Sequence, residues 1–194
     1  METHLTSEKS NDMAQRANHF GWKVVTAPAQ CNMKSKAGRE ASRKGVDPGK
    51  ANTNGVAIGA RKWLDLSETM QPSKLVRGAH SSLQQTLAKD AFVSMDPAFK
   101  IAVWRSQGAS IAIVAAYFEV NEWRSGKNHA TMARIAAVLK LLGLKFIVFA
   151  DWNTTKDTLI KVGWHTKLSG QFIEPADVQF TCSAGLGRML DFCW

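Results

Sequence analysis

The chain has 194 residues, of which 45% are hydrophobic and seven are tryptophan. This composition is typical of a globular domain with its own core and excludes a disordered chain. The 25 lysines and arginines outnumber the 16 aspartates and glutamates, and the net charge of +9 favours polyanionic partners such as nucleic acid, phosphorylated small molecules or an anionic membrane surface. A soluble protein that is basic without such a partner is an equally open interpretation.

The sequence indicates neither a membrane span nor secretion. The most apolar stretch, 135–150, is interrupted by Lys140, Gly143 and Lys145, so it contains no run of 18 apolar residues. The N-terminus METHLTSEKS is polar and does not resemble a signal peptide. Three cysteines far apart in the chain support neither a disulfide framework nor a zinc motif. We therefore expect an intracellular protein of the nucleus or cytoplasm.

The first third of the chain is predicted to hold a helix and two strands around a basic segment. Spaced apolar residues predict a helix over Glu8–Phe20, and WKVVTA predicts a strand at 22–27. Residues 28–54 carry many Lys and Arg among Gly, Ser, Asn and Pro, which predicts a basic, flexible loop. Such a loop is most often simply solvated, although it can also steer an anionic substrate. An Asn-Gly turn signal then precedes a strand at 55–61.

The remainder of the chain alternates strands with helices, after a stretch at 65–98 that has no clear pattern. The predicted elements are a β-hairpin at 99–106 and 109–118, a helix at 128–143, a strand at 144–150 and a short helix at 155–164. Asn128 is the expected cap of the long helix and Gly143 its stop. This order predicts a layered α/β fold with a mixed sheet.

Asp151 and Asn153 follow directly after the apolar strand that ends at Ala150. In open α/β sheets, ligands bind just beyond the carboxyl ends of strands, where this pair falls. Aspartate and asparagine are also the commonest residues of turns and caps. The short motif alone is therefore compatible with a site for metal or phosphate and with a simple turn.

Several different short motifs follow one another in a characteristic order along nearly the whole chain. They are Met1-Glu2-Thr3-His4-Leu5, Gly55–Arg61, Ala116-Tyr117, Asp151-Trp152-Asn153, Thr181 and Leu190-Asp191-Phe192. In this order and spacing the chain resembles the endonuclease/exonuclease/phosphatase superfamily, which has the deoxyribonuclease-like fold and includes apurinic-site endonucleases and the endonuclease domains of non-LTR retrotransposons. The resemblance implies one domain over residues 1–194, folded as an incomplete four-layer α-β-β-α sandwich of two mixed sheets flanked by helices.

The resemblance also assigns a role to each matching residue. Glu2 is expected to bind the catalytic Mg²⁺, with Mn²⁺ as a substitute, because a hard divalent ion prefers one or two carboxylates plus waters. Tyr117 is expected to hydrogen-bond the scissile phosphate, and Asp151 to orient or activate the attacking water. Asn153 is expected to grip phosphate and hold the aspartate, and Asp191 to contribute further at the site. Without the resemblance, Glu2 would be read as a solvated terminus, and Tyr117 and Asp191 as ordinary residues.

The sequence departs from the superfamily pattern at both ends. The strand that carries an asparagine upstream of the glutamate is absent, and so is the last strand with its histidine, which is central to phosphate hydrolysis. None of the five histidines occupies that position, although His4 lies beside Glu2 and is placed to touch substrate or to pack. The resemblance therefore implies a domain truncated at both ends, with weak activity or none.

Three functions remain open at this stage. The first is a Mg²⁺-dependent phosphodiesterase, most plausibly an endonuclease that acts on nucleic acid, with DNA favoured over RNA. The second is a catalytically inactive remnant that binds nucleic acid without needing Mg²⁺. The third is a phosphatase or lipid-headgroup phosphodiesterase of the same superfamily. The basic composition favours the first two over the third.

Overall fold

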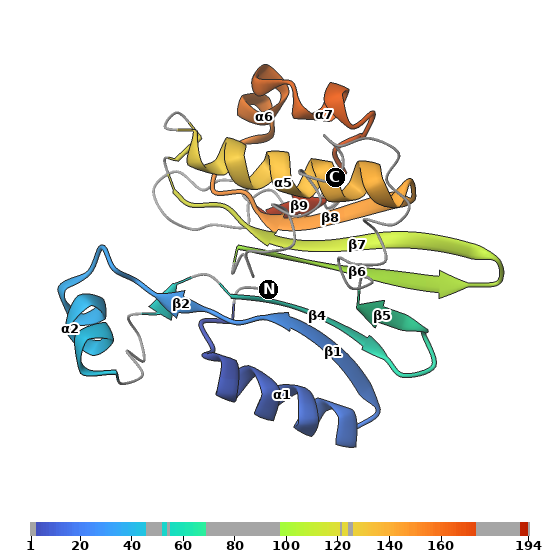
Figure 1. Ribbon diagram of the computed structural model, residues 1–194. Coiled ribbons are helices and arrows are strands. Elements are labelled where there is room, and N and C mark those ends of the chain that lie inside the picture. The colour runs from blue at the N-terminus through green and yellow to red at the C-terminus, as the bar shows by residue number, and fades with distance from the viewer. Residues whose placement is uncertain are drawn as a thin grey trace.

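The computed structural model describes residues 3–45, 52–53, 55–68, 98–120, 122–123, 126–173 and 191–193. Figure 1 shows the layers in order: helix α1 (Ser7–His19), a small sheet, a larger sheet, and helix α5 (Lys127–Leu142), with α6 (Lys156–Val162) and α7 (Trp164–Lys167) beyond it. This is the predicted α-β-β-α sandwich, and the fold class is confirmed. No helix in the described ranges is long and apolar enough to cross a bilayer.

The small sheet pairs β1 (Trp22–Ala27) with β4 (Val56–Arg61) in antiparallel register, so that Ala27 lies opposite Val56. Both strands agree with the prediction to within one residue. The two described strands of this sheet are antiparallel, so the mixed character of the fold belongs to the larger sheet.

The larger sheet has the order β5-β6-β7-β8-β9. Its strands are β5 (Leu66–Glu68), β6 (Phe99–Ser106), β7 (Ala109–Tyr117), β8 (Lys145–Asp151) and β9 (Asp191–Cys193). β7 and β8 run parallel and the other neighbours run antiparallel. The predicted hairpin and the strand after the long helix are present, whereas β5 and β9 were not predicted.

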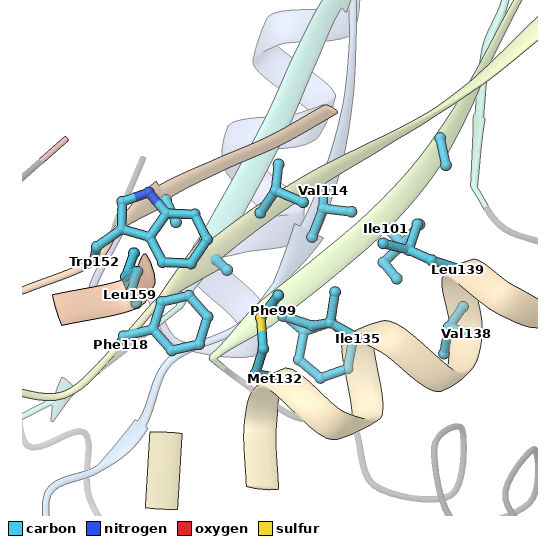
Figure 2. Close-up of a cluster of buried hydrophobic side chains, with 14 of the residues drawn as sticks. Phe99, Ile101, Val114, Phe118, Met132, Ile135, Val138, Leu139, Trp152 and Leu159 are labelled. Carbon is cyan, nitrogen blue, oxygen red and sulfur yellow. The ribbon is translucent and has the colours of Figure 1, made fainter. Parts of the chain in front are cut away.

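The hydrophobic core on the helix side of the larger sheet holds most of the large buried side chains (Figure 2). Alternate residues of the strands, such as Val114 and Val148, meet Met132 and Ile135 from α5, and all four are fully buried. Every second side chain of the strands therefore packs against the side chains on one face of the helix, which recur about every 3.6 residues. Each such buried side chain contributes roughly 1.5–3 kcal/mol to the free energy of unfolding.

A second core lies between the two sheets. Val25 and Ile58 from the small sheet pack with Ala102 and Ala115 from the larger one. Small alanines on β6 and β7 let the two sheets approach closely. Because the larger sheet is covered on both faces, its strands are almost continuously apolar in sequence.

Two predicted elements differ in detail from the structure. The segment expected to be a flexible loop at 28–54 contains α2 (Lys36–Lys44), between the short strands β2 (Gln30–Cys31) and β3 (Asn52–Thr53). The helix expected at 155–164 is two short helices, because Gly163 has a left-handed φ of 74° and ends α6.

Candidate active site

Three of the residues predicted to be catalytic lie in one row at the ends of three neighbouring strands. Tyr117 at the end of β7 is in register with Asp151 at the end of β8, and Asp151 is in register with Asp191 at the start of β9. Adjacent strands lie about 4.8 Å apart, so the row is roughly 10 Å wide. For Asp191 the structure describes the backbone position alone.

Tyr117 and Asp151 belong to the face of the larger sheet that looks toward the small sheet. Tyr117 packs against the core between the sheets. Val148 and Ala150 belong to the core on the helix side, and because strand residues alternate between faces, Asp151 lies on the same face as Tyr117. Both residues are half-buried. Electrostatic interactions are stronger in such a setting than in bulk water.

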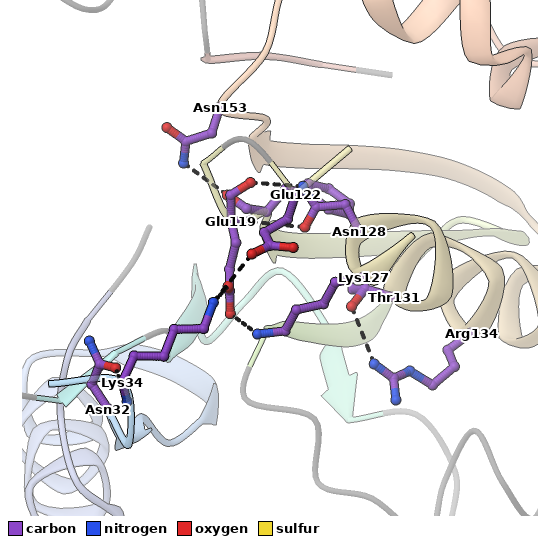
Figure 3. Close-up of polar contacts among 10 residues, drawn as sticks. Asn32, Lys34, Glu119, Glu122, Lys127, Asn128, Thr131, Arg134 and Asn153 are labelled. Atoms are coloured by element: carbon purple, nitrogen blue, oxygen red, sulfur yellow. Dashed lines mark hydrogen bonds and ion pairs between the residues drawn. The ribbon is translucent and has the colours of Figure 1, made fainter. Parts of the chain in front are cut away.

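The Asp-Trp-Asn motif forms a tight turn that is tied to the neighbouring strand. The backbone N–H of Asn153 donates to Asp151 Oδ1 at 3.1 Å. The side-chain nitrogen of Asn153, Nδ2, donates to the carbonyl oxygen of Phe118 at 2.9 Å (Figure 3). Asn153 has φ 48°, a left-handed conformation that asparagine tolerates better than most residues. The backbone N–H of Phe118 also donates to the carbonyl oxygen of Asp151 at 3.0 Å.

Asp151 and Asn153 therefore form a turn, and the hydrogen bonds of this turn use only part of the bonding capacity of the two side chains. An ionised carboxylate has two oxygens and about four acceptor positions, so the bond from Asn153 orients the Asp151 carboxylate without saturating it. The same holds for Asn153, whose amide nitrogen carries two hydrogens.

A wall of aromatic rings supports the row from the helix side. Trp152 is fully buried and stacks on Phe118, with ring centroids 5.0 Å apart and planes at 9°. Trp123 Nε1 donates to the carbonyl oxygen of Trp152 at 2.9 Å. These three residues were not predicted to belong to the site, because nothing in the local sequence distinguishes them from other core aromatics.

A buried asparagine holds the segment that follows Tyr117 and Phe118. Asn128 Oδ1 accepts from the backbone N–H of Glu119 at 3.0 Å, and its Nδ2 donates to the carbonyl oxygen of Glu119 at 2.8 Å. The prediction that Asn128 caps the long helix is wrong. The helix begins at Lys127, its N-cap is Gly126, and the Asn128 side chain pairs with the backbone of Glu119 instead.

An ion-pair cluster beside this segment connects it to the chain before α2. Lys34 Nζ lies 3.1 Å from Glu119 Oε2 and 3.3 Å from Glu122 Oε1, and Lys127 also bonds to Glu119 (Figure 3). Partial burial acts to raise the pKa of Glu119, but the hydrogen bonds from Lys127 and Lys34 hold that pKa below its ordinary value. Hydrogen bonds to Glu119 and then Glu122 raise the pKa of Lys34.

The segment Thr3–Leu5 lies against the beginning of β4. The Thr3 N–H donates to the carbonyl oxygen of Gly55, and the Ala29 N–H donates to that of Leu5, each at 2.8 Å. Figure 1 shows that the start of β4 and the ends of β7 and β8 lie on the same side of the molecule. The residue adjacent to Glu2 is therefore on the side of the row, while Glu2 itself and Thr181 lie outside the described residues.

Three of the described histidines pack against aromatic rings, and His19 does so against the neighbouring Phe20. His129 Nδ1 accepts from Trp164 Nε1 at 3.1 Å, and its ring lies against Trp123. His165 lies against Phe172. These aromatic contacts give His129 and His165 a role in packing.

In the part of the chain that the structure describes, no three His, Cys, Asp or Glu side chains form a group able to hold a metal. Asp151 provides a hard oxygen donor at the row, and Mg²⁺ binds through as few as one or two carboxylates plus waters. The donor chemistry therefore fits Mg²⁺, and the assignment of Glu2 as a ligand stays a prediction.

No protein-family model and no curated protein matches this sequence. Among solved structures, the chain is similar to the endonuclease domain of TRAS1, a telomere-specific non-LTR retrotransposon, with a TM-score of 0.55 and 14% sequence identity. The similarity covers 89% of this chain and 64% of that one, so the chain spans less than two thirds of that domain. The predicted resemblance is confirmed as a shared fold.

Proposed function

We propose that this chain hydrolyses phosphodiester bonds in nucleic acid in a Mg²⁺-dependent reaction, as an endonuclease. The observation that carries the proposal is the row of Tyr117, Asp151 and Asp191 at one edge of the larger sheet. β7 and β8 are parallel, and their carboxyl ends are where ligands bind in α/β sheets. The fold shared with a retrotransposon endonuclease domain and the net charge of +9 support nucleic acid as the substrate.

Each residue of the row has a role in this proposal. The Asp151 carboxylate, oriented by the N–H of Asn153, accepts a hydrogen bond from the attacking water and directs its lone pair at phosphorus. The Tyr117 hydroxyl and the Asn153 amide donate to the phosphoryl oxygens, on which charge grows during attack. Asp191 adds a carboxylate at the third position of the row.

A divalent ion supplies the charge that these side chains lack. When bound, Mg²⁺ would supply positive charge beside the non-bridging and leaving oxygens of the phosphate. Glu2 is the proposed ligand from this chain. The residues of the row orient water and phosphate whether or not Glu2 is the metal ligand, because strand register and the Asp-Trp-Asn turn set their positions.

A second candidate function is binding of nucleic acid without catalysis. It is favoured by the hydrogen bonds that Asp151 and Asn153 make within the turn, because these bonds give both residues a reason to be present in an inactive protein. This candidate predicts salt-sensitive binding that does not require Mg²⁺.

The test is nicking of supercoiled plasmid by the purified chain, in Mg²⁺ and in EDTA, beside the Asp151→Asn variant. Asparagine keeps a side-chain oxygen that accepts from the N–H of residue 153, so the turn is preserved while the carboxylate is removed. Asp157→Asn on the exposed surface of α6 is the matched control. We expect nicking to require Mg²⁺ and to fall about 10²–10⁴-fold in Asp151→Asn alone.

The two candidates give different results. Plasmid binding without Mg²⁺-dependent nicking by the parent chain would favour the binding protein and contradict the nuclease. Equal nicking by the parent chain and Asp151→Asn would show that the row takes no part in the reaction.

A further inference from the structure

The segment 30–45 forms an arm beside the two sheets, with α2 at its outer end. Figure 1 shows α2 standing away from the sheets, on the side where β7 and β8 end. The arm has five lysines and arginines and a single acidic residue, Glu40. Its charge is therefore concentrated in a short length of chain.

Three of the cations in the arm form one face of α2. At 100° per residue, Lys36, Arg39 and Arg43 fall within an arc of about 60°. The buried residues of the helix, Gly38 and Ala41, lie roughly opposite to that arc. All three cations are exposed, so the helix turns its apolar face inward and its cationic face to solvent.

The ion pairs of the arm leave two of its cations available. Lys44 pairs with Glu40 at 2.7 Å, and Arg39 donates to the carbonyl oxygens of Met33 and Lys34. Within the described residues, Lys36 and Arg43 make no side-chain hydrogen bond or ion pair.

The arm is a folded element with defined contacts. Ser35 Oγ accepts from the N–H of Gly38 at 2.9 Å, which caps the helix, and Cys31 Sγ donates to the carbonyl oxygen of Gly38 at 2.9 Å. A Cβ at position 38 would lie 2.0 Å from the carbonyl oxygen of Asn32, so only glycine fits there. The direction of the cationic face is therefore set by packing.

Lys34 places the arm next to the catalytic row. Its ammonium pairs with Glu119, two residues beyond Tyr117, and with Glu122. The carbonyl oxygen of Phe118, between Tyr117 and Glu119, is the one that holds Asn153. A polymer whose scissile phosphate lies at the row extends past this side of the molecule, whereas a small phosphate ester does not.

We propose that the arm binds the sugar–phosphate backbone of the nucleic-acid substrate beside the scissile bond, with Lys36 and Arg43 as the phosphate contacts. The proposal rests on the proposed function, which supplies the polymeric substrate. The two residues are seven positions apart, or about 10 Å along the helix. Phosphates of one DNA strand follow one another at about 3.4 Å along the axis, so this length covers roughly three of them.

The experiment measures binding of a 20-base-pair duplex DNA in EDTA, at several salt concentrations, for the parent chain and for Lys36→Gln with Arg43→Gln. The matched control is Lys140→Gln with Lys145→Gln, which removes the same charge from exposed positions at the end of α5 and the start of β8. Removing one phosphate-binding cation makes the slope of log K against log salt shallower by about 0.9. The slope should therefore change by about 1.8 for the arm variant and by much less for the control.

Every outcome decides the proposal. A slope that changes equally in both variants would show that total charge matters and the arm does not, and would overturn this inference alone. Salt-sensitive binding that neither variant alters would also overturn it and leave the nuclease proposal intact. The same titration is repeated with a single-stranded RNA of 20 bases, and a parent chain that binds neither the duplex DNA nor this RNA would overturn both proposals.

Discussion

The row of Tyr117, Asp151 and Asp191 and the arm differ in how firmly the fold holds them. The row lies at the ends of β7 and β8 and the start of β9, in paired register, and is backed by the buried rings of Phe118 and Trp152. The arm leaves the small sheet and meets the larger one through the exposed ammonium of Lys34. Groups that must orient a water and a phosphate need rigid positions. Groups that attract a long anion need only carry charge on a face that points toward it. The largest effects on stability should therefore come from the support of the row, and the smallest from the link to the arm.

The strongest test of this contrast is Trp152→Ala. Trp152 is 1% exposed and fills the space between Phe118 and α6, so its removal leaves a cavity behind the row. We expect the free energy of unfolding to fall by about 3–5 kcal/mol, measured by denaturant titration. Trp63, which is 79% exposed, is the matched control, and Trp63→Ala should change stability little. Similar losses in the two variants would mean that the aromatic wall does not support the row.

The elements that this contrast depends on were predictable from sequence to different degrees. The central strands are almost continuously apolar because both faces are buried, and the long helix repeats its apolar residues at helical spacing along one side. The bounds of these elements were therefore predicted to within one residue. β5 and β9 are each three residues long and form by pairing with β6 and β8, which a local pattern does not record.

The arm and the hydrogen bonds between Asn128 and the backbone of Glu119 illustrate a different limit of sequence analysis. α2 is mostly polar and contains Gly38, so its composition favours a loop, and its helix depends on the Ser35 cap and on close contact with Asn32. Asn128 has the residue type and position of a cap, yet its partner is the backbone of Glu119, nine residues earlier. Asp151 was indicated both by its place after an apolar strand and by the superfamily resemblance, whereas Tyr117 and Asp191 were indicated by the resemblance. The structure brings the three positions into one row, and their catalytic roles stay predictions.

A smaller effect than that of Trp152→Ala is expected from Asn128→Ala, which tests a polar contact that supports the row. The change removes both bonds to the backbone of Glu119: its N–H is left without that acceptor, while its carbonyl oxygen keeps the bond from the N–H of Glu122 at 3.3 Å. Leaving such a group unpaired costs about 1–3 kcal/mol of unfolding free energy, and nicking should fall because the segment that holds Asn153 loosens. Asn18→Ala on the exposed face of α1 is the control. Unchanged stability and nicking in Asn128→Ala would show that the hydrogen bonds between Asn128 and the backbone of Glu119 are dispensable.

The smallest effect is expected from Lys34→Gln, which cuts the link between the row and the arm. Exposed ion pairs contribute little to global stability, so the informative measurement is hydrogen exchange of the α2 amides, which should quicken while the Phe118 and Asn153 amides stay protected. The pKa of Glu119 is lowered in the folded state, so its favourable interaction with Lys34 is present above the ordinary carboxylate pKa and is lost as the pH falls through the lowered value. The difference between the parent chain and Lys34→Gln should therefore be present at neutral pH and disappear in acid, after correction for intrinsic exchange rates. A difference that persists when Glu119 is protonated would mean that the arm is positioned by its own packing and not by this ion pair.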